Sequence, residues 1–220
     1  MLYFFGDSHT YGTGLRDCMT QDNYAGPLHS QLSFPALIAT TMNMSYKNLG
    51  IDGASNQQIL QSVRASNITA DDIAIICWSH WSRNYAFRAD GEKQILVHFK
   101  DCEPFYAIYD ETALQYASLL TIEHANLWLS HRSIPLLNFS THKHDGVQSN
   151  GYMLDFMDIH AVDLACDMIH FGEQSHSIWA AIVTEHVTTH ILSNRSKCAN
   201  YLTENSLLSD NIISSDSTEV

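Results

Sequence analysis

The sequence predicts an α/β fold in which a mostly parallel β-sheet lies between layers of helices. Short apolar runs alternate along the chain with segments whose apolar residues recur at helical spacing, as repeated strand–helix units require. Hydrophobic residues make up 45% of the chain and charged residues 16%, a balance that supports a buried core and argues against disorder. A chain of 220 residues is long enough to form one such domain.

The first predicted elements are a strand and a helix separated by a long connection. Residues 2–5 form a short apolar run that Gly6 ends, which is typical of a buried strand. Residues 7–15 follow as a glycine-containing loop that leads into a helix. The segment Phe34 to Met42 is predicted to be helical, because Pro35 is well tolerated in the first turn of a helix.

The second and third strands flank another helix. Tyr46 to Leu49 is predicted as a short strand that Gly50 closes. Ser55 to Ala65 is predicted as a helix, since its apolar residues share one face. Ile73 to Trp78 is a continuous apolar run, as expected for a strand that is covered on both faces.

The second half of the chain is less regular. Residues 79–110 mix aromatic and charged residues and are predicted as an irregular insertion with one short strand over Ile95 to Phe99. The remaining predictions are a helix over Glu111 to His131, a buried strand over Ile134 to Phe139, loop and short helix over 140–165, and a helix within Phe171 to Leu192. Residues 1–202 are expected to form the domain, and residues 203–220, acidic and serine-rich, a flexible tail.

Charge and composition exclude several classes of partner. The net charge of −13 argues against nucleic acid or an anionic membrane surface as the main partner. No apolar run approaches the roughly 20 residues that cross a bilayer. The N-terminus lacks the basic region of a signal peptide, so we expect a cytoplasmic protein. The five cysteines are odd in number and form no C-x-x-C pair, which is typical of reduced thiols.

Three segments carry residues that suit catalysis. The first is Gly6-Asp7-Ser8, which places a serine hydroxyl just after a strand and at the start of a helix, where backbone N–H groups are free. That position suits a nucleophile whose attack creates an oxyanion. The same residues would also suit a plain helix cap, since Asp and Ser are both preferred there.

The other two segments lie at later strand–helix junctions. Gly53 sits in a turn after the second strand, where the lack of a Cβ lets the backbone approach a ligand, although the turn could equally be ordinary. Asp167 and His170 precede the last helix, and an aspartate at this spacing can orient an imidazole that acts as a general base. Nearby acids offer alternatives, Asp163 among them.

Together the three segments resemble the SGNH hydrolases, which are also called GDSL-type esterases and lipases. The resemblance depends on Gly6-Asp7-Ser8, on Gly53, and on Asp167-x-x-His170 followed by His176 and Ala180. It implies a three-layer α/β/α sandwich of the SGNH or flavodoxin-like type over residues 1–202. The resemblance further implies that Ser8 is the nucleophile, His170 the base and Asp167 its orienting partner, with the N–H groups of Ser8 and Gly53 binding the oxyanion.

One block of the chain departs from the family pattern. The family normally has an asparagine after its third strand, and its side chain donates to the oxyanion. Here Ser79 and His80 stand in that place, and direct alignment of the strand favours His80, while a shift of one residue favours Ser79. Either side chain can donate a hydrogen bond, whereas loss of one donor would cost about 2.7–4 kcal/mol of transition-state stabilisation.

Metal and cofactor sites are not expected. The cluster His142, His144 and Asp145 has metal-ligating residue types, but we interpret it as a solvated loop. Gly12-Thr13-Gly14 lacks the third glycine of a dinucleotide-binding motif, because Asp17 stands there.

The sequence therefore predicts a serine ester hydrolase that acts on a small-molecule or carbohydrate ester. The O-acyl group is expected to be short, such as acetyl on a carbohydrate, because aromatic residues at and beyond the end of the third strand could form a flat sugar-binding wall: Trp78, Trp81, Tyr85 and Phe87. The same residues could equally form an apolar acyl pocket. The alternative is a catalytically silent protein of this fold that binds a glycan or a partner, an interpretation that the missing asparagine motivates.

Overall fold

The computed structural model describes the chain except for six segments, which are residues 21–24, 88–93, 98–109, 141–152, 156–161 and 194–220. The chain divides into two compact units, Met1–Ala181 and Ile182–Val220. The first unit contains the sheet and every predicted site residue. The described part of the second contains the end of one helix and a π-helical turn over Val187–Leu192. No helix among the described residues is both long enough and apolar enough to cross a membrane.

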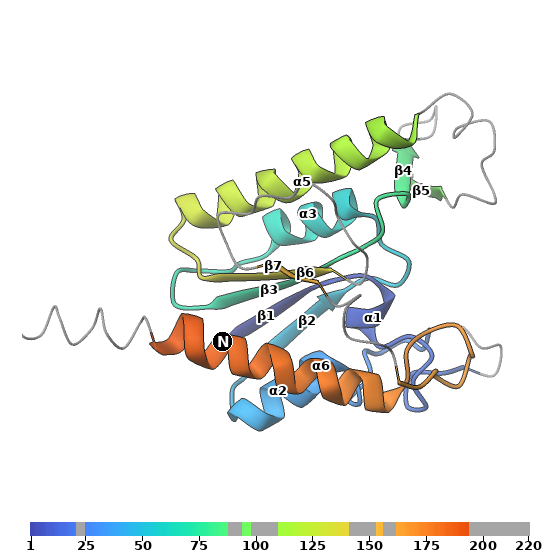
Figure 1. Cartoon of the computed structure of the whole chain (residues 1–220), viewed down its shortest axis with the longest axis vertical. Helices are drawn as coiled ribbons and strands as arrows, with labels where there is room; N and C mark the ends of the chain where they lie inside the picture. Colours follow the sequence, from blue (N-terminus) through green and yellow to red (C-terminus); the bar gives the residue numbers. More distant parts are fainter. Residues whose placement is uncertain (21–24, 88–93, 98–109, 141–152, 156–161, 194–220) are drawn as a thin grey trace, which may run out of the picture. The chain divides into compact units, whose positions relative to one another are not determined.

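Five parallel strands form the central sheet in the order β2-β1-β3-β6-β7 (Figure 1). The central strands β1 and β3 are buried at every residue, because helices cover both of their faces. The edge strand β2 is only partly buried. The strands span Leu2–Gly6 (β1), Tyr46–Gly50 (β2), Ile73–Trp78 (β3), Leu136–Ser140 (β6) and Met153–Asp155 (β7).

Helices form a layer on each side of this sheet (Figure 1). On one side lie α3 and α5, and on the other lie α2 and the first part of α6. A short helix, α1, lies at the end of β1. The helices span Ser8–Tyr11 (α1), Phe34–Met42 (α2), Asn56–Ala65 (α3), Glu111–His131 (α5) and Glu173–His186 (α6). The predicted three-layer α/β/α architecture is therefore confirmed.

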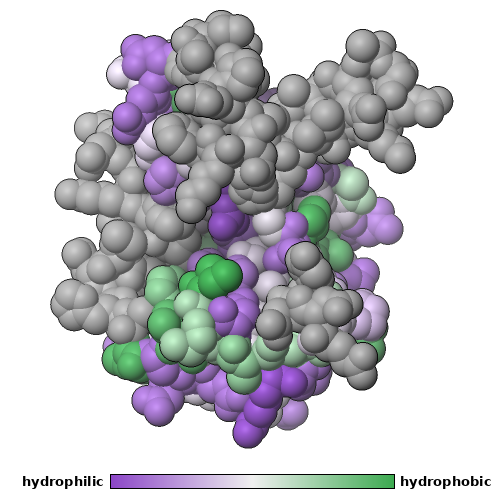
Figure 2. Space-filling model, turned by 90° about the vertical axis from the view of Figure 1, so that its right-hand side faces the viewer, coloured by the Kyte–Doolittle hydropathy of each residue, from purple (hydrophilic) through white to green (hydrophobic). Residues whose placement is uncertain are grey.

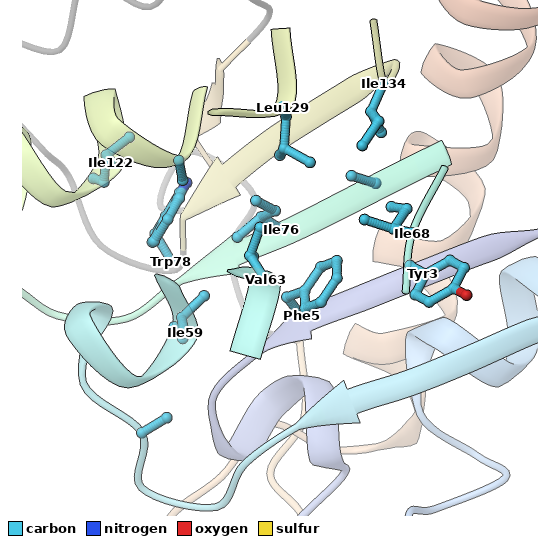
Figure 3. Packing of buried hydrophobic residues seen from close by; sticks show 13 residues of the cluster. Tyr3, Phe5, Ile59, Val63, Ile68, Ile76, Trp78, Ile122, Leu129 and Ile134 are labelled. Atoms are coloured by element: carbon cyan, nitrogen blue, oxygen red, sulfur yellow. The ribbon is translucent and has the colours of Figure 1, made fainter. Parts of the chain in front are cut away.

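The alternation of side chains along β1 supplies both halves of the core. Tyr3 and Phe5 pack with residues of α3, α5 and β3 in one buried cluster (Figure 3). Phe4 points to the opposite face, where its ring meets that of Phe34 on α2 edge to face, with centroids 6.1 Å apart. Phe34 in turn contacts Trp179 of α6. A strand whose successive residues are all apolar is thus stabilised from both sides.

Several predicted boundaries coincide with the structure. The helices over Phe34–Met42 and Glu111–His131 and the strand over Ile73–Trp78 have the expected ends. The predicted loop and short helix over 140–165 is wrong at β7, a strand of three residues whose sequence, Met-Leu-Asp, gives no apolar run. The insertion holds an antiparallel pair, Asn84–Phe87 (β4) and Gln94–Val97 (β5), where one strand was expected.

Candidate active site

The candidate site lies at the edge of the sheet where the parallel strands end. Two glycines allow α1 to pack directly on this edge. A Cβ on Gly6 would lie 2.0 Å from Oγ1 of Thr10, and a Cβ on Gly50 would lie 2.6 Å from the backbone nitrogen of Tyr11. Gly6 and Gly50 are neighbours in the sheet, so α1 packs on the ends of both β1 and β2.

Ser8 is the first residue of α1 and is buried. The helix is capped by Asp7, whose side chain accepts a hydrogen bond from the His9 N–H at 3.1 Å. Asp7 therefore caps the helix, and the Ser8 hydroxyl is left without a hydrogen-bond partner among the described residues. The hydroxyl of Thr184 is buried in the same way, so it is the position of Ser8 at the start of α1 that makes it a candidate nucleophile.

Asp167 and His170 form a tight pair in the loop before α6. The distance from Asp167 Oδ2 to His170 Nδ1 is 2.6 Å, and Asp167 Oδ1 accepts the backbone N–H groups of Ile169 and His170 at 3.0 Å each. Burial opposes ionisation of Asp167, but these hydrogen bonds outweigh it and lower its pKa. The carboxylate is thus placed to accept the Nδ1–H of His170 and to orient the ring.

The His170 loop lies against α1. The ring of His170 meets that of His9 edge to face, with centroids 5.5 Å apart, and His9 directly follows Ser8. The Ser8 hydroxyl has no partner in the described part of the chain, so a Ser8–His170 hydrogen bond is not formed in this structure. Such catalytic bonds are often loose before substrate binds. The structure thus places the first and third predicted segments side by side.

Gly14, which the sequence pattern related only to an incomplete dinucleotide-binding motif, joins the same two segments. Its φ is +83°, and a Cβ at this position would lie 2.4 Å from Asp167 Oδ2. The carbonyl of Gly14 also accepts the N–H of Cys166. Only glycine fits this close approach without strain. The glycine at position 14 therefore indicates that another part of the chain, here Asp167, packs closely on this loop.

Asp163, the alternative acid, has a structural role. It accepts hydrogen bonds from the backbone N–H groups of Gln174 and Ser175 and from the Ser175 hydroxyl, all in the first turn of α6. Burial raises the pKa of Asp163, but these bonds to Ser175 and Gln174 lower it more. Asp163 is therefore engaged in holding the start of α6 and not in orienting His170.

Two further histidines are buried beside the site as neutral rings. Burial, together with the charges of neighbouring histidines, lowers the pKa of His9 and of His176 to about 3 each. His9 stacks on Phe171, and His176 accepts the backbone N–H of Phe34 at its Nδ1, 3.1 Å away. His176 thereby accepts the N–H of the first residue of α2. In this chain the second histidine of the pattern is thus a packing residue.

Gly53 lies in the turn after β2 with a φ of +68°. The turn is held to the loop that follows α1 by a hydrogen bond of 2.7 Å from the Thr13 hydroxyl to Asp52 Oδ1. The glycine therefore belongs to the same edge of the sheet as α1.

The segment after β3 places its two candidate donors differently. The N–H of Ser79 donates to Asn56 Oδ1 at 2.8 Å, and its hydroxyl accepts a hydrogen bond of 3.2 Å from Arg83 Nη1. His80 accepts the N–H of Ser82 at its Nδ1, so its ring is held in the turn that follows the strand. Ser79 and Asp7 share Arg83 as a partner, because Arg83 Nη1 lies 2.9 Å from Asp7 Oδ2.

The prediction of an aromatic wall is wrong for Trp78. Trp78 is fully buried in the core, where its Nε1–H donates to Asn138 Oδ1 at 3.0 Å, so it is not a wall residue. Trp81 is half-buried, and its ring contacts that of His80 at a tilt of 36°, with centroids 4.7 Å apart. The side chains of Tyr85 and Phe87 lie outside the described residues, as do His142, His144 and Asp145. Within the described part, no three His, Cys, Asp or Glu side chains are grouped to hold a metal.

The exposed rim around His170 is apolar. Met168 and Ile169, which lie between Asp167 and His170 in the sequence, are more than two-thirds exposed, with 71% and 78% of their surfaces accessible. Figure 2 shows the face at which the strands end, where hydrophobic residues lie among hydrophilic ones. The pair of Asp167 and His170 is therefore bordered by exposed apolar side chains.

Known structures share this fold. No family model matches the chain, and no curated protein matches it significantly in sequence. A carbohydrate esterase, whose active site is described as having divergent catalytic and non-catalytic binding functions, superposes with a TM-score of 0.58 at 12% identity over 86% of this chain. A G-D-S-L lipolytic protein from Desulfitobacterium hafniense gives a TM-score of 0.51 at 14% identity, covering 84% of this chain and 97% of its own.

An acetyl xylan esterase from the rumen bacterium Butyrivibrio proteoclasticus gives a TM-score of 0.52 at 11% identity, over 84% of this chain and 62% of its own. The chain likewise spans 65% of the length of the carbohydrate esterase. At these identities the likeness concerns the fold. The chain therefore has the fold of the SGNH hydrolases.

Proposed function

We propose that the protein is a serine ester hydrolase in which Ser8, His170 and Asp167 form the catalytic triad. The observation that carries this proposal is the hydrogen-bonded pair of Asp167 and His170, packed against the helix that begins at the unpartnered hydroxyl of Ser8. Nucleophile, base and orienting acid thus come from two loops that meet at one edge of the sheet. This is the arrangement that acyl transfer through a serine requires.

In the proposed acylation step, Ser8 Oγ attacks the carbonyl carbon of the ester while His170 Nε2 takes the hydroxyl proton. The tetrahedral oxyanion accepts hydrogen bonds from the backbone N–H groups of Ser8 and Gly53. The Ser8 N–H has no partner within its helix, since it belongs to the first turn. Collapse of the intermediate expels the alcohol, which receives the proton from His170 and leaves an acyl-Ser8 ester.

Deacylation repeats these roles with water. His170, neutral again, takes a proton from the water that attacks the acyl carbon, and then returns it to Ser8 Oγ as the acid leaves. The Asp167 carboxylate stabilises the imidazolium in both steps. Its low pKa keeps it ionised, so the orientation of His170 is maintained at neutral pH.

We propose a short O-acyl ester, such as an acetyl group on a carbohydrate, as the substrate class. Two proteins that share the fold are named a carbohydrate esterase and an acetyl xylan esterase, which supports this choice. Trp81 remains a candidate for stacking on a sugar ring, since it is half-buried in the turn that follows β3. The net charge of −13 disfavours polyanionic substrates.

The test is hydrolysis of p-nitrophenyl acetate and of an acetylated xylo-oligosaccharide by the wild type and by Ser8→Ala. We expect Ser8→Ala to fall to the background rate, a loss of at least about 10³-fold. A fluorophosphonate probe should label the wild type and not the variant. Ser130→Ala is the matched control, because Ser130 is exposed on α5, and it should retain full activity and labelling.

The alternative, a binding protein without catalytic activity, predicts no difference in ester hydrolysis between the wild type and Ser8→Ala. It is favoured by the absence of an asparagine side chain at the end of β3, where Ser79 and His80 stand. If the wild type is no faster than Ser8→Ala on both esters, yet binds the acetylated oligosaccharide, the esterase proposal is wrong and the silent binding function replaces it.

A further inference from the structure

The loop that follows β3 turns back and returns an arginine to the edge of the sheet. The backbone N–H of Arg83 donates to the carbonyl oxygen of His80 at 3.0 Å, which closes the turn. The Arg83 side chain thereby reaches back to Ser79, the first residue beyond β3. A residue several positions past the strand thus occupies the region where the family pattern leads one to expect an asparagine.

Two hydrogen bonds hold the guanidinium in place. Arg83 Nη1 donates to Asp7 Oδ2 at 2.9 Å and to Ser79 Oγ at 3.2 Å, which uses both of its hydrogens. Nε and Nη2 make no hydrogen bond to a described residue. The side chain is 24% exposed, whereas Asp7 is fully buried. The guanidinium is therefore fixed at one end and has up to three N–H donors that no described residue uses.

Asp7 links this cation to the nucleophile. Its Oδ1 accepts the His9 N–H and so caps α1, while its Oδ2 holds Arg83. Because Ser8 lies directly between Asp7 and His9, one carboxylate sets the positions of both the nucleophilic helix and the guanidinium. An ion pair whose carboxylate is fully buried costs desolvation energy and is weak evidence for stability alone.

We propose that Arg83 supplies the third oxyanion donor of this esterase, in place of the family's asparagine. The inference depends on the proposed role of Ser8. As Ser8 Oγ attacks, negative charge develops on the carbonyl oxygen, and a free Arg83 N–H donates a charge-assisted hydrogen bond to it. Arg83 gives up no proton, so the proton still moves only between Ser8, His170 and the leaving alcohol.

The neighbouring candidates take supporting roles under this proposal. The Ser79 hydroxyl accepts from Arg83, so Ser79 is a positioning residue that orients the guanidinium. His80 Nδ1 is occupied by the N–H of Ser82 in the turn that brings Arg83 back. Neither side chain is required to face the substrate.

The experiment compares kcat and KM of Arg83→Gln with those of the wild type on p-nitrophenyl acetate. We expect kcat to fall about 10²- to 10³-fold with little change in KM, because the bond forms only in the transition state. Arg64→Gln is the matched control, since Arg64 is exposed at the end of α3, and it should behave as the wild type. Phenylboronic acid, which forms a tetrahedral anion on a serine hydroxyl, should lose affinity for Arg83→Gln by a similar factor.

A second variant separates the effect of losing Arg83 on stability from its effect on catalysis. Arg83→Gln leaves the Asp7 carboxylate buried without its cation, which lowers the melting temperature. Asp7→Asn/Arg83→Gln removes that charge and should recover stability while kcat stays low. Millimolar guanidinium chloride should restore part of the activity of Arg83→Ala and should not accelerate Arg64→Ala, a response that a purely structural arginine would not give.

The outcomes distinguish the two proposals. If Arg83→Gln and the double variant keep kcat within about three-fold of the wild type, Arg83 is not the donor, and a large loss in His80→Ala would assign that role to His80. If the wild type itself is no faster than Ser8→Ala, the proposed esterase function fails, and the role of Arg83 fails with it.

Discussion

At the scale of single residues, two aspartates four positions apart in one loop have separate roles. Asp167 accepts the Nδ1–H of His170 and the two N–H groups that shape its own turn. Asp163 accepts the N–H groups and the hydroxyl at the start of α6. Both carboxyls have lowered pKa values for the same physical reason, since hydrogen bonds outweigh burial, so their partners and not their ionisation distinguish them.

Asparagine substitutions separate the two roles. We expect Asp167→Asn to keep the fold and to lower kcat about 10³- to 10⁴-fold, because an amide no longer holds His170 in the reactive tautomer. Asp163→Asn should lower the melting temperature and leave kcat of the folded enzyme nearly unchanged. Steady-state kinetics and thermal unfolding on the two proteins check this, and a larger kinetic loss in Asp163→Asn would transfer the orienting role to Asp163.

At the scale of elements, the site depends on loops that pack through glycines. Gly14 follows α1 and meets Asp167, and Gly172 precedes α6 and meets Asp163, where a Cβ would lie 2.4 Å and 2.3 Å from a carboxylate oxygen. Each glycine therefore fixes how closely a loop approaches an aspartate. The two contacts are similar in geometry and differ in which aspartate they hold.

Alanine at these glycines gives a matched pair of variants. Gly14→Ala should lower both the melting temperature and kcat, because it strains a positive φ and displaces the partner of His170. Gly172→Ala should lower the melting temperature and keep kcat within about three-fold. Kinetics measured well below each melting temperature provide the comparison, and equal kinetic losses would contradict the separation of roles.

At the scale of the whole molecule, buried neutral histidines make stability depend on pH. His9 and His176 have pKa values of about 3 in the folded chain, against an ordinary value of 6.5. Below pH 6.5 the unfolded chain binds protons that the folded chain does not, so unfolding becomes more favourable as the pH falls. The lowered pKa values of Asp163 and Asp167 affect stability only at lower pH, near and below 3.8.

We therefore expect the free energy of unfolding to be largest above pH 6.5 and to decrease toward pH 4. Each histidine contributes a slope of about 1.4 kcal/mol per pH unit once its unfolded form is fully protonated. Urea unfolding at several pH values measures the slope. His176→Gln should reduce it by about one titrating group, and a slope equal to that of the wild type would show that His176 is not the source.

Removal of residues 203–220 is expected to change neither the melting temperature nor kcat. The segment is acidic, serine-rich and without a strong apolar face. It lies outside the described residues, so this expectation depends on composition alone. Thermal unfolding of the shortened chain checks it, and a large drop would show that its leucine and isoleucine residues pack on the rest of the protein.

The sequence alone determined the fold class and predicted the pairing of Asp167 with His170. Continuous apolar runs such as Ile73–Trp78 specify buried strands, and the D-x-x-H spacing before the last helix lets these two side chains hydrogen-bond, because both are local patterns. The three-residue strand β7 carried no such local signal, and its pairing with β6 depends on the rest of the sheet.

Only the tertiary structure decided which distant residues meet. Asp7 and Arg83 are 76 positions apart, and they pair because β1 and β3 are neighbours whose ends lie at one edge. Trp78, a candidate wall residue by sequence, is drawn into the core by α3 and α5, and Gly14 is fixed by the approach of Asp167. Contacts of this kind follow from strand order and helix packing, which no short stretch of sequence encodes.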